Sequence, residues 1–218
     1  MVIAAIVIFG IAYGVLRWRS AIVGKSSSVL LSSAARARVL ANGLAIDVLY
    51  QKPIADCSRT RWFAHLAMFW GFLGLAVTTT MDTILNPTAA PLPITSPVRI
   101  LGNISGIFFV AGVTYSLVRR LVVRDVRENS TKGDAVFLAL LFLTGVTGFV
   151  VEFFSQFNFV SADSFSYWSH LILVAALLVT APFTKFVHAI GRPILLLLRR
   201  TEIEKEKVSS AKVSLGDH

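Results

Sequence analysis

The chain of 218 residues carries little charge and almost no cysteine. Charged side chains make up 15% of it and hydrophobic ones 55%, and its mean hydropathy is +0.71. This composition excludes an ordinary soluble domain, which has about 25% charged residues, and indicates an integral membrane protein. The single cysteine, Cys57, excludes an internal disulfide framework, a cysteine-rich zinc site and a cysteine-ligated iron–sulfur cluster. Any redox centre in the chain must therefore be held by other side chains.

Acidic residues are also scarce: 12 acidic residues face 21 basic ones, for a net charge of +9. Such a balance would suit nucleic-acid binding if the basic residues covered one soluble face. They are instead clustered beside apolar segments, so orientation in a membrane explains them better. We therefore expect no nucleic-acid partner.

What the sequence has in abundance is long apolar runs, and these predict an all-α integral membrane bundle of five transmembrane helices. The predicted spans cover about residues 2–22, 62–82, 100–121, 135–155 and 167–188. The first run has its positive charges after it rather than before it, which favours a retained span over a cleaved signal peptide. We expect one transmembrane domain over residues 1–200 and a cytoplasmic tail over 201–218 that starts as a helix and then frays.

The loops between these spans alternate in charge. The first and third loops and the tail are rich in lysine and arginine, whereas the second and fourth loops have few charges. The positive-inside rule therefore predicts a multi-pass protein of the cytoplasmic membrane with its N-terminus outside and its C-terminus inside. Residues 25–60 are amphipathic rather than continuously apolar, and we expect a helix at the inner surface there. That segment is either a solvated linker or a docking site for a cytoplasmic partner.

Three of the four histidines lie in predicted spans, where ionisable groups are rare and usually functional. His170 and His188 are 18 residues apart, which on one helix is five turns and roughly 27 Å, close to the thickness of a bilayer core. The predicted topology puts His65 and His188 at the inner level and His170 at the outer level. Two neutral imidazoles at one depth can bind the iron of a b-type haem from both sides. The other interpretation is that each histidine sits near an interface and hydrogen-bonds a neighbouring helix.

A family resemblance is carried by "HLILVAALLVTAPFTKFVH", the end of the fifth predicted span. It resembles the last transmembrane helix of the gamma subunit of respiratory nitrate reductase and its relatives. These include the cytochrome b subunit of heterodisulfide reductase and a hydrogenase-linked cytochrome. "VLYQKPIADCSRTRWFAHLAMFWGFLGL" is similar to the heterodisulfide reductase branch, and the likeness covers roughly residues 29–200.

The resemblance implies a membrane cytochrome b that passes electrons between the quinone pool and a cytoplasmic iron–sulfur or flavin-containing oxidoreductase. By this likeness His65 and His188 match the ligands of an inner haem b, and His170 matches one ligand of an outer haem. The nitrate reductase pattern has a second histidine on the helix that carries His65, and this chain has none there. The predicted metal of these sites is the haem iron.

Three arrangements are open at the outer level. Met81 could be the other ligand of the outer haem, since its predicted depth is within about 3 Å of that of His170. The outer haem could instead be five-coordinate, or it could be absent and His170 could serve a quinone. A predicted quinone site contains His170 and Arg99, with the Thr78–Thr80 run beside them and Asp82 and Glu152 as proton carriers.

A different class of function, a cofactor-free transporter or assembly subunit, would explain the hydrophobicity and the loops. It would leave the depths of the three histidines unexplained. Transporters also tend to have repeated halves with broken helices, and the sequence shows no such pattern. We therefore expect an electron-transfer subunit that carries out no substrate chemistry beyond that of the quinone.

Overall fold

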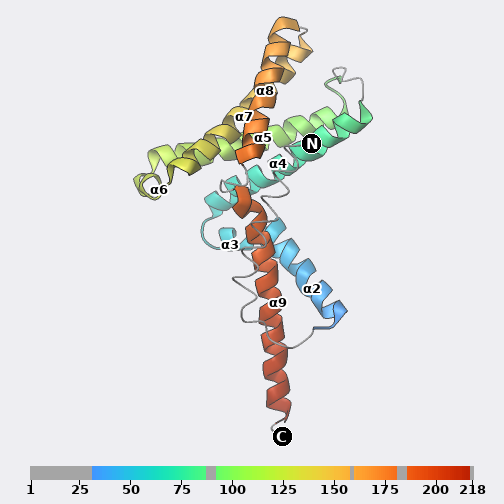
Figure 1. The fold of residues 1–218 in the computed structure, drawn as a ribbon, viewed down its shortest axis with the longest axis vertical. Coiled ribbons are helices and arrows are strands. Elements are labelled where there is room, and N and C mark those ends of the chain that lie inside the picture. Colours follow the sequence, from blue (N-terminus) through green and yellow to red (C-terminus); the bar gives the residue numbers. More distant parts are fainter. Residues whose placement is uncertain (1–30, 87–91, 158–159, 181–185, 217–218) are drawn as a thin grey trace. The chain divides into compact units, whose positions relative to one another are not determined.

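The structure, a computed structural model, describes residues 31–86, 92–157, 160–180 and 186–216 (Figure 1). For residues 160–163, 186–193 and 211–216 it describes the backbone. Every regular element within these ranges is a helix, which confirms the predicted all-α class for this part of the chain. The helices form two compact units, which are described separately below.

One unit is a group of apolar helices. It contains α4 (Arg59–Leu85), α5 (Pro97–Val122), α6 (Arg124–Glu128), α7 (Lys132–Gln156) and α8 (Val160–Thr180). Among the described residues, α4, α5 and α7 are long and apolar enough to cross a membrane, and α8 contains a shorter apolar stretch, Ser164–Thr180. The second, third and fourth predicted spans are thus confirmed as apolar helices of spanning length.

The first and last predicted spans have a different outcome. Residues 2–22 lie outside the described residues. The predicted helix 167–188 is described in two pieces, α8 to Thr180 and α9 from Phe186, and these pieces belong to different units. The five-turn spacing between His170 and His188 therefore stays a prediction, as do the count of five spans and the orientation.

Local sequence explains where these helices begin. α5 begins at Pro97, whose missing N–H would have no partner in the first turn of a helix. α7 begins with a capping box, in which Thr131 Oγ1 accepts from the Asp134 amide at 3.3 Å and Asp134 Oδ2 accepts from the Thr131 amide at 3.2 Å. The proline thus removes an N–H that would have no partner, and the capping box satisfies two N–H groups.

Close packing of small residues holds α4 against α5. A Cβ atom added at Gly71 would lie 2.6–2.8 Å from backbone atoms of Ser105 and Phe109, and one at Gly112 would lie 2.6 Å from the carbonyl oxygen of Ala64. Glycine at these positions lets the two backbones approach, as in other membrane helix pairs. Further along, α5 packs against α7 and α7 against α8. The buried core of this unit consists of Phe109, Val113, Leu138, Leu141 and Leu177.

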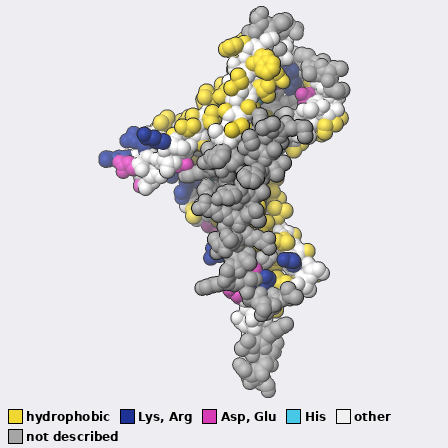
Figure 2. Space-filling view, in the orientation of Figure 1, with side chains coloured by type: hydrophobic (Ala, Val, Ile, Leu, Met, Phe, Trp, Pro, Cys, Tyr) yellow, Lys and Arg dark blue, Asp and Glu magenta, His cyan; other side chains and the backbone are white. Residues whose placement is uncertain are grey.

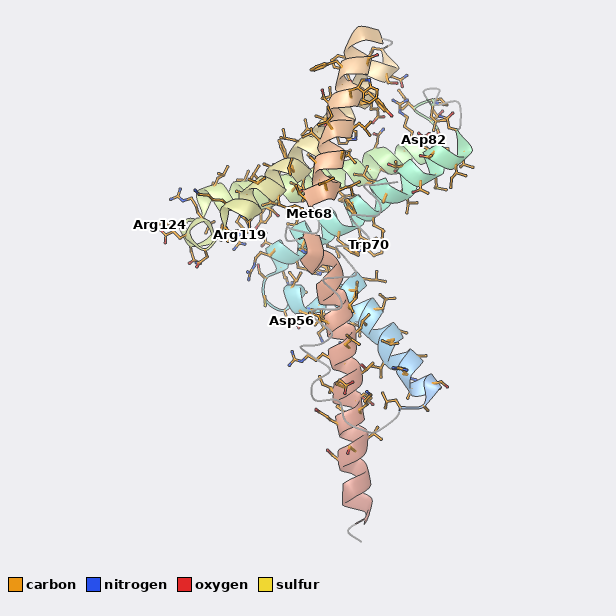
Figure 3. The ribbon with its side chains drawn as sticks, in the orientation of Figure 1. Asp56, Met68, Trp70, Asp82, Arg119 and Arg124 are labelled. Atoms are coloured by element: carbon orange, nitrogen blue, oxygen red, sulfur yellow. The ribbon has the colours of Figure 1, made fainter. Side chains whose placement is uncertain are left out.

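The outward faces of the same helices are apolar. Ile84 is 71% exposed, Ile107 61% and Phe165 77%, which suits lipid and would be unfavourable in water. Figure 2 shows hydrophobic side chains along these helices and basic ones around α6. Arg119 and Arg124 lie at that end of the group, and Asp82 lies at the far end of α4 (Figure 3).

The other unit contains α2 (Ser33–Gly43), the π-helix η1 (Leu44–Leu49), α3 (Lys52–Ala55) and α9 (Phe186–Gly216). The predicted amphipathic segment is therefore helical over much of its length. Asp47, 8% exposed, forms a two-pronged ion pair with the Arg200 guanidinium, with Arg200 Nη2 donating to Oδ1 at 2.8 Å. A Cβ added at Gly43 would lie 2.7 Å from Leu197, so α2 and α9 are in close contact.

The tail departs from the sequence-based expectation. Residues 201–216 continue α9 as helix, where fraying was predicted. The physical reason is local: Lys205 Nζ lies 2.8 Å from Glu202 Oε1 and Lys207 lies 3.7 Å from Glu204, and glutamate and lysine are good helix formers.

Candidate functional site

One polar contact between two apolar helices is made by His170. This residue is half-buried on α8, and its ring Nδ1 lies 3.0 Å from Thr147 Oγ1 on α7. Thr147 Oγ1 also donates to the carbonyl of Leu143, one turn earlier, at 2.7 Å. The imidazole is therefore anchored by α7 rather than by its own helix.

The ring of His170 lies against Thr147 and Gly148 of α7, and we call these two positions its seat. A Cβ added at Gly148 would lie 3.4 Å from His170 Cε1, so the ring rests against a position that has no side chain. The hydroxyl of Thr144 is buried and has no hydrogen-bond partner among the described residues. A buried hydroxyl without a partner is unfavourable, and it marks a place where a bound molecule could supply the missing hydrogen bond.

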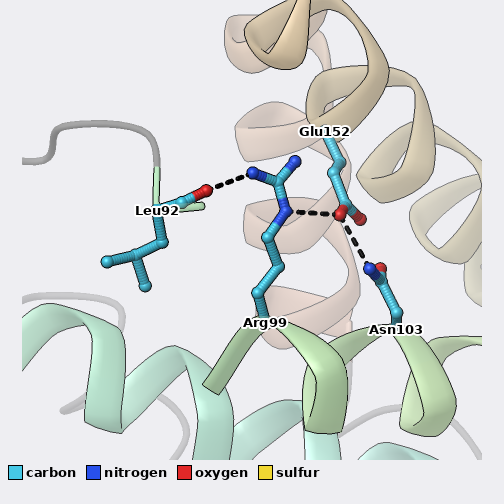
Figure 4. A network of polar contacts seen from close by, with 4 residues as sticks. All are labelled: Leu92, Arg99, Asn103 and Glu152. Atoms are coloured by element: carbon cyan, nitrogen blue, oxygen red, sulfur yellow. Dashed lines mark hydrogen bonds and ion pairs between the residues drawn. The ribbon is translucent and has the colours of Figure 1, made fainter. Parts of the chain in front are cut away.

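A second polar cluster joins α5, α7 and the segment before α5 (Figure 4). Arg99 Nε lies 2.7 Å from Glu152 Oε1, and Asn103 Nδ2 donates to the same oxygen at 2.9 Å. Arg99 Nη1 donates to the carbonyl of Leu92. The Arg99 side chain is 12% exposed and that of Glu152 is 29% exposed, so the ion pair is largely shielded. A charge pair in such surroundings needs its additional hydrogen bonds, and Asn103 and Leu92 supply them.

The two clusters share one helix face. Thr144, Gly148 and Glu152 follow one another at intervals of four residues on α7, so they lie in a row with about 6 Å between neighbours. Glu152 is thus one turn beyond the seat of His170. The prediction that His170, Arg99 and Glu152 belong to one region is consistent with this spacing.

His65 and Met81 lie on α4, and both are exposed among the described residues. They are 16 residues apart on one continuous helix, so their side chains leave the axis about 160° apart. The α5-facing stripe of α4, which includes Ala64 and Gly71, lies between these two directions. His65 and Met81 therefore project from different flanks of α4.

Of the two predicted ligand pairs, only Met81 with His170 has both side chains among the described residues. The side chain of His188 lies outside the described residues, and α9 and α4 belong to different units. Within the described part of the chain, α4 packs on α5 and α8 on α7, so Met81 has no contact with His170. No group of three or more histidine, cysteine, aspartate or glutamate side chains suited to a metal occurs among the residues described. The haem-ligand assignments therefore stay predictions.

Sequence reasoning missed three participants: Thr147, Thr144 and Asn103. A threonine or asparagine in an apolar helix is a weak signal, because threonine hydroxyls usually bond their own helix, as Thr114 does to Val110 at 2.7 Å. The stronger signal was the run "TGVTGF" in a predicted span, where each of two threonines is followed by a glycine.

The fold and the two polar clusters define a helical membrane protein that holds His170 and the Arg99–Glu152 ion pair between apolar helices. The model of the HdrE family, the E subunit of dihydromethanophenazine:CoB–CoM heterodisulfide reductase, matches residues 41–196. The chain therefore belongs to this family. The heterodisulfide reductase branch of the predicted resemblance is thereby confirmed.

Individual relatives carry the same description. The corresponding protein of Methanosarcina barkeri is 30% identical over 193 residues, which are 80% of this chain and 72% of that protein. That of Methanosarcina acetivorans is 27% identical over 172 residues, 72% of this chain and 65% of the relative. The chain thus spans slightly less than two thirds of the latter protein. No solved structure matches the chain.

Proposed function

We propose that the chain is a b-type cytochrome subunit that anchors a cytoplasmic oxidoreductase to the membrane. In this role it passes electrons between a lipophilic two-electron carrier and that partner. The relatives' name specifies a dihydrophenazine donor and a CoB–CoM heterodisulfide acceptor. If the same donor and acceptor apply to this chain, electrons flow from the reduced carrier to an iron–sulfur or flavin-containing partner that reduces a disulfide. The carrier belongs to the quinone or phenazine class.

The observation that carries this proposal is the seat of His170. The ring is hydrogen-bonded to the neighbouring helix α7, which the interpretation without haem also predicts, and it rests on Gly148, which leaves room beside it. Metal-ligating histidines commonly have one ring nitrogen fixed by such a hydrogen bond. The residues present thus fit an axial ligand of haem.

The proposed haem ligands are His65 and His188 at the inner level and His170 at the outer level. Haem supplies reversible one-electron chemistry, which lets a two-electron carrier exchange electrons singly with an iron–sulfur partner. His65 stands in the second turn of α4 and His188 in the first turn of α9. Each of them lies close to a region rich in basic residues, which matches the common inner depth deduced from the loops.

The second ligand at the outer level is the open part of this assignment. Met81 has a suitable predicted depth, but among the described residues α4 makes no contact with α8, which carries His170. Replacement by leucine keeps the volume and removes the thioether. Loss of the outer haem in Met81→Leu would identify Met81 as the ligand, and its retention would favour a five-coordinate haem.

The proposed carrier site is the region of Arg99 and Glu152, and it includes His170 in the arrangement without an outer haem. The Arg99 guanidinium is held by Glu152 and Leu92, and the Thr144 hydroxyl is buried nearby on the same row of α7. A carbonyl oxygen or ring nitrogen of a carrier could accept a hydrogen bond from such donors, and Glu152 could take up a proton released on oxidation.

The decisive experiment is a reduced-minus-oxidised absorption spectrum of the purified chain. We expect a b-type α band. His65→Ala and His188→Ala should each remove the inner component and spare the outer one, and His170→Ala should do the reverse. His218→Ala is the matched control, because it removes a histidine that has no proposed ligand role. A purified chain without any b-type band would refute the proposed function, and loss of every component in His170→Ala would refute the two-level arrangement.

A further inference from the structure

We infer that Thr147 is a positioning residue that fixes the tautomer of His170 and thereby presents Nε2 as the iron-binding atom. The role of this tautomer in binding iron rests on the proposed function. The tautomer itself is a property of the chain without haem, so it can be examined separately.

The direction of the hydrogen bond follows from counting hydrogens. A threonine hydroxyl has one hydrogen to donate and can also accept. Thr147 Oγ1 lies 2.7 Å from the Leu143 carbonyl, which only accepts, and 3.0 Å from His170 Nδ1. The shorter contact takes the hydroxyl hydrogen, so the longer one is donated by the ring, from Nδ1–H to Thr147 Oγ1. The neutral imidazole then has its lone pair on Nε2.

A second carbonyl supports the same assignment. Thr147 Oγ1 is also 3.2 Å from the Thr144 carbonyl oxygen, which likewise only accepts. The single hydroxyl hydrogen of Thr147 therefore faces two carbonyl acceptors on its own helix, and the ring nitrogen supplies the hydrogen of the third contact. A haem ligand must offer the opposite ring nitrogen unprotonated, and a proton on Nδ1 provides this.

Thr114 on α5 offers a matched comparison. Its hydroxyl bonds the Val110 carbonyl one turn back at 2.7 Å, as that of Thr147 bonds Leu143, and both threonines are partly buried. Its helix packs against α4 and α7, whereas His170 lies on α8. Thr114→Val therefore matches Thr147→Val in chemistry and in the loss of a back-bonded hydroxyl, and it leaves the ring of His170 untouched.

The first test is ¹⁵N NMR of the haem-free full chain in detergent, labelled at histidine. The His170 signals are identified by their loss in His170→Ala. We expect the Nδ1–H tautomer in the unaltered chain, in Thr147→Ser and in Thr114→Val. Thr147→Val should shift the population towards Nε2–H. A predominant Nε2–H tautomer in the unaltered chain, or an unchanged tautomer in Thr147→Val, would overturn the inference.

The second test connects the tautomer to haem. In the haem-loaded chain, the component lost in His170→Ala should bind haem on the order of 10–100-fold more weakly in Thr147→Val, with recovery in Thr147→Ser. The inner component serves as an internal reference for correct folding. If Thr147→Val weakens both components equally, or weakens neither, the positioning role is wrong. If His170→Ala removes no component, the outer haem assignment fails instead, while the NMR result still decides the tautomer.

Discussion

The contact between α4 and α5 at Gly71 allows a quantitative prediction. An alanine at this position would put its Cβ 2.6 Å from the Phe109 nitrogen and 2.7 Å from the Ser105 carbonyl oxygen. Ordinary van der Waals contact begins at 3.4 Å, so the shortfall is about 0.8 Å. Both obstructing atoms belong to a helical backbone and cannot rotate away. The two helices must therefore separate along this interface.

The expected cost follows from two opposing effects. Overpacking of this kind costs about 1–3 kcal/mol, because the neighbouring side chains lose contact when the helices move apart. Replacing a helical glycine with alanine gains up to about 1 kcal/mol in helix propensity. Gly102 on α5 offers a matched control, since its Cβ would meet Thr78 at an ordinary 3.6 Å. The propensity gain is common to both variants, so the difference between them isolates the steric cost.

The assay is the free energy of unfolding, measured by adding dodecyl sulfate to the chain in mild-detergent micelles and following tryptophan fluorescence. Gly71→Ala is expected to be less stable than Gly102→Ala by about 1–3 kcal/mol. Gly102→Ala should be at least as stable as the unaltered chain. Equal unfolding free energies for the two variants would refute the close approach of α4 and α5 at Gly71.

Two further predictions concern the ion pairs. Glu152→Gln keeps the shape of the side chain but leaves the Arg99 charge uncompensated, so thermal unfolding in detergent should show a loss of about 1–3 kcal/mol. The neutral double variant, Arg99→Gln with Glu152→Gln, should recover part of the lost stability. If Glu152→Gln alone is as stable as the unaltered chain, this reasoning is wrong. Asp47→Asn should speed amide hydrogen exchange around Arg200 on α9, because the charged pair there is lost, whereas the exposed Asp56→Asn should not. Equal exchange in these two variants would show that the pair does not hold α9.

Much of the fold could be predicted because its causes are local. Hydrophobic runs of about 20 residues and alternating basic loops lie along the chain itself, and they predicted α4, α5 and α7 nearly to their observed ends. The continuation of the helical tail to Gly216 was missed because glutamate–lysine pairs at a spacing of three stabilise a polar helix without any apolar pattern. Family membership was also accessible, since the run that ends at His188 and the segment before His65 carry it.

Composition and hydropathy alone establish the class of this protein: an apolar helical bundle that places three histidines and few charges in its predicted spans. Which side chains meet depends instead on how the helices pack. Thr147 and His170 are 23 residues apart, Arg99 and Glu152 are 53 apart, and Gly71 meets Ser105 and Phe109 on another helix. These pairings depend on the rotation and axial shift of each helix against its neighbour. Hydropathy cannot fix them in a bilayer, because lipid and a packed helix are both apolar surroundings, and only close packing and buried hydrogen bonds distinguish the two.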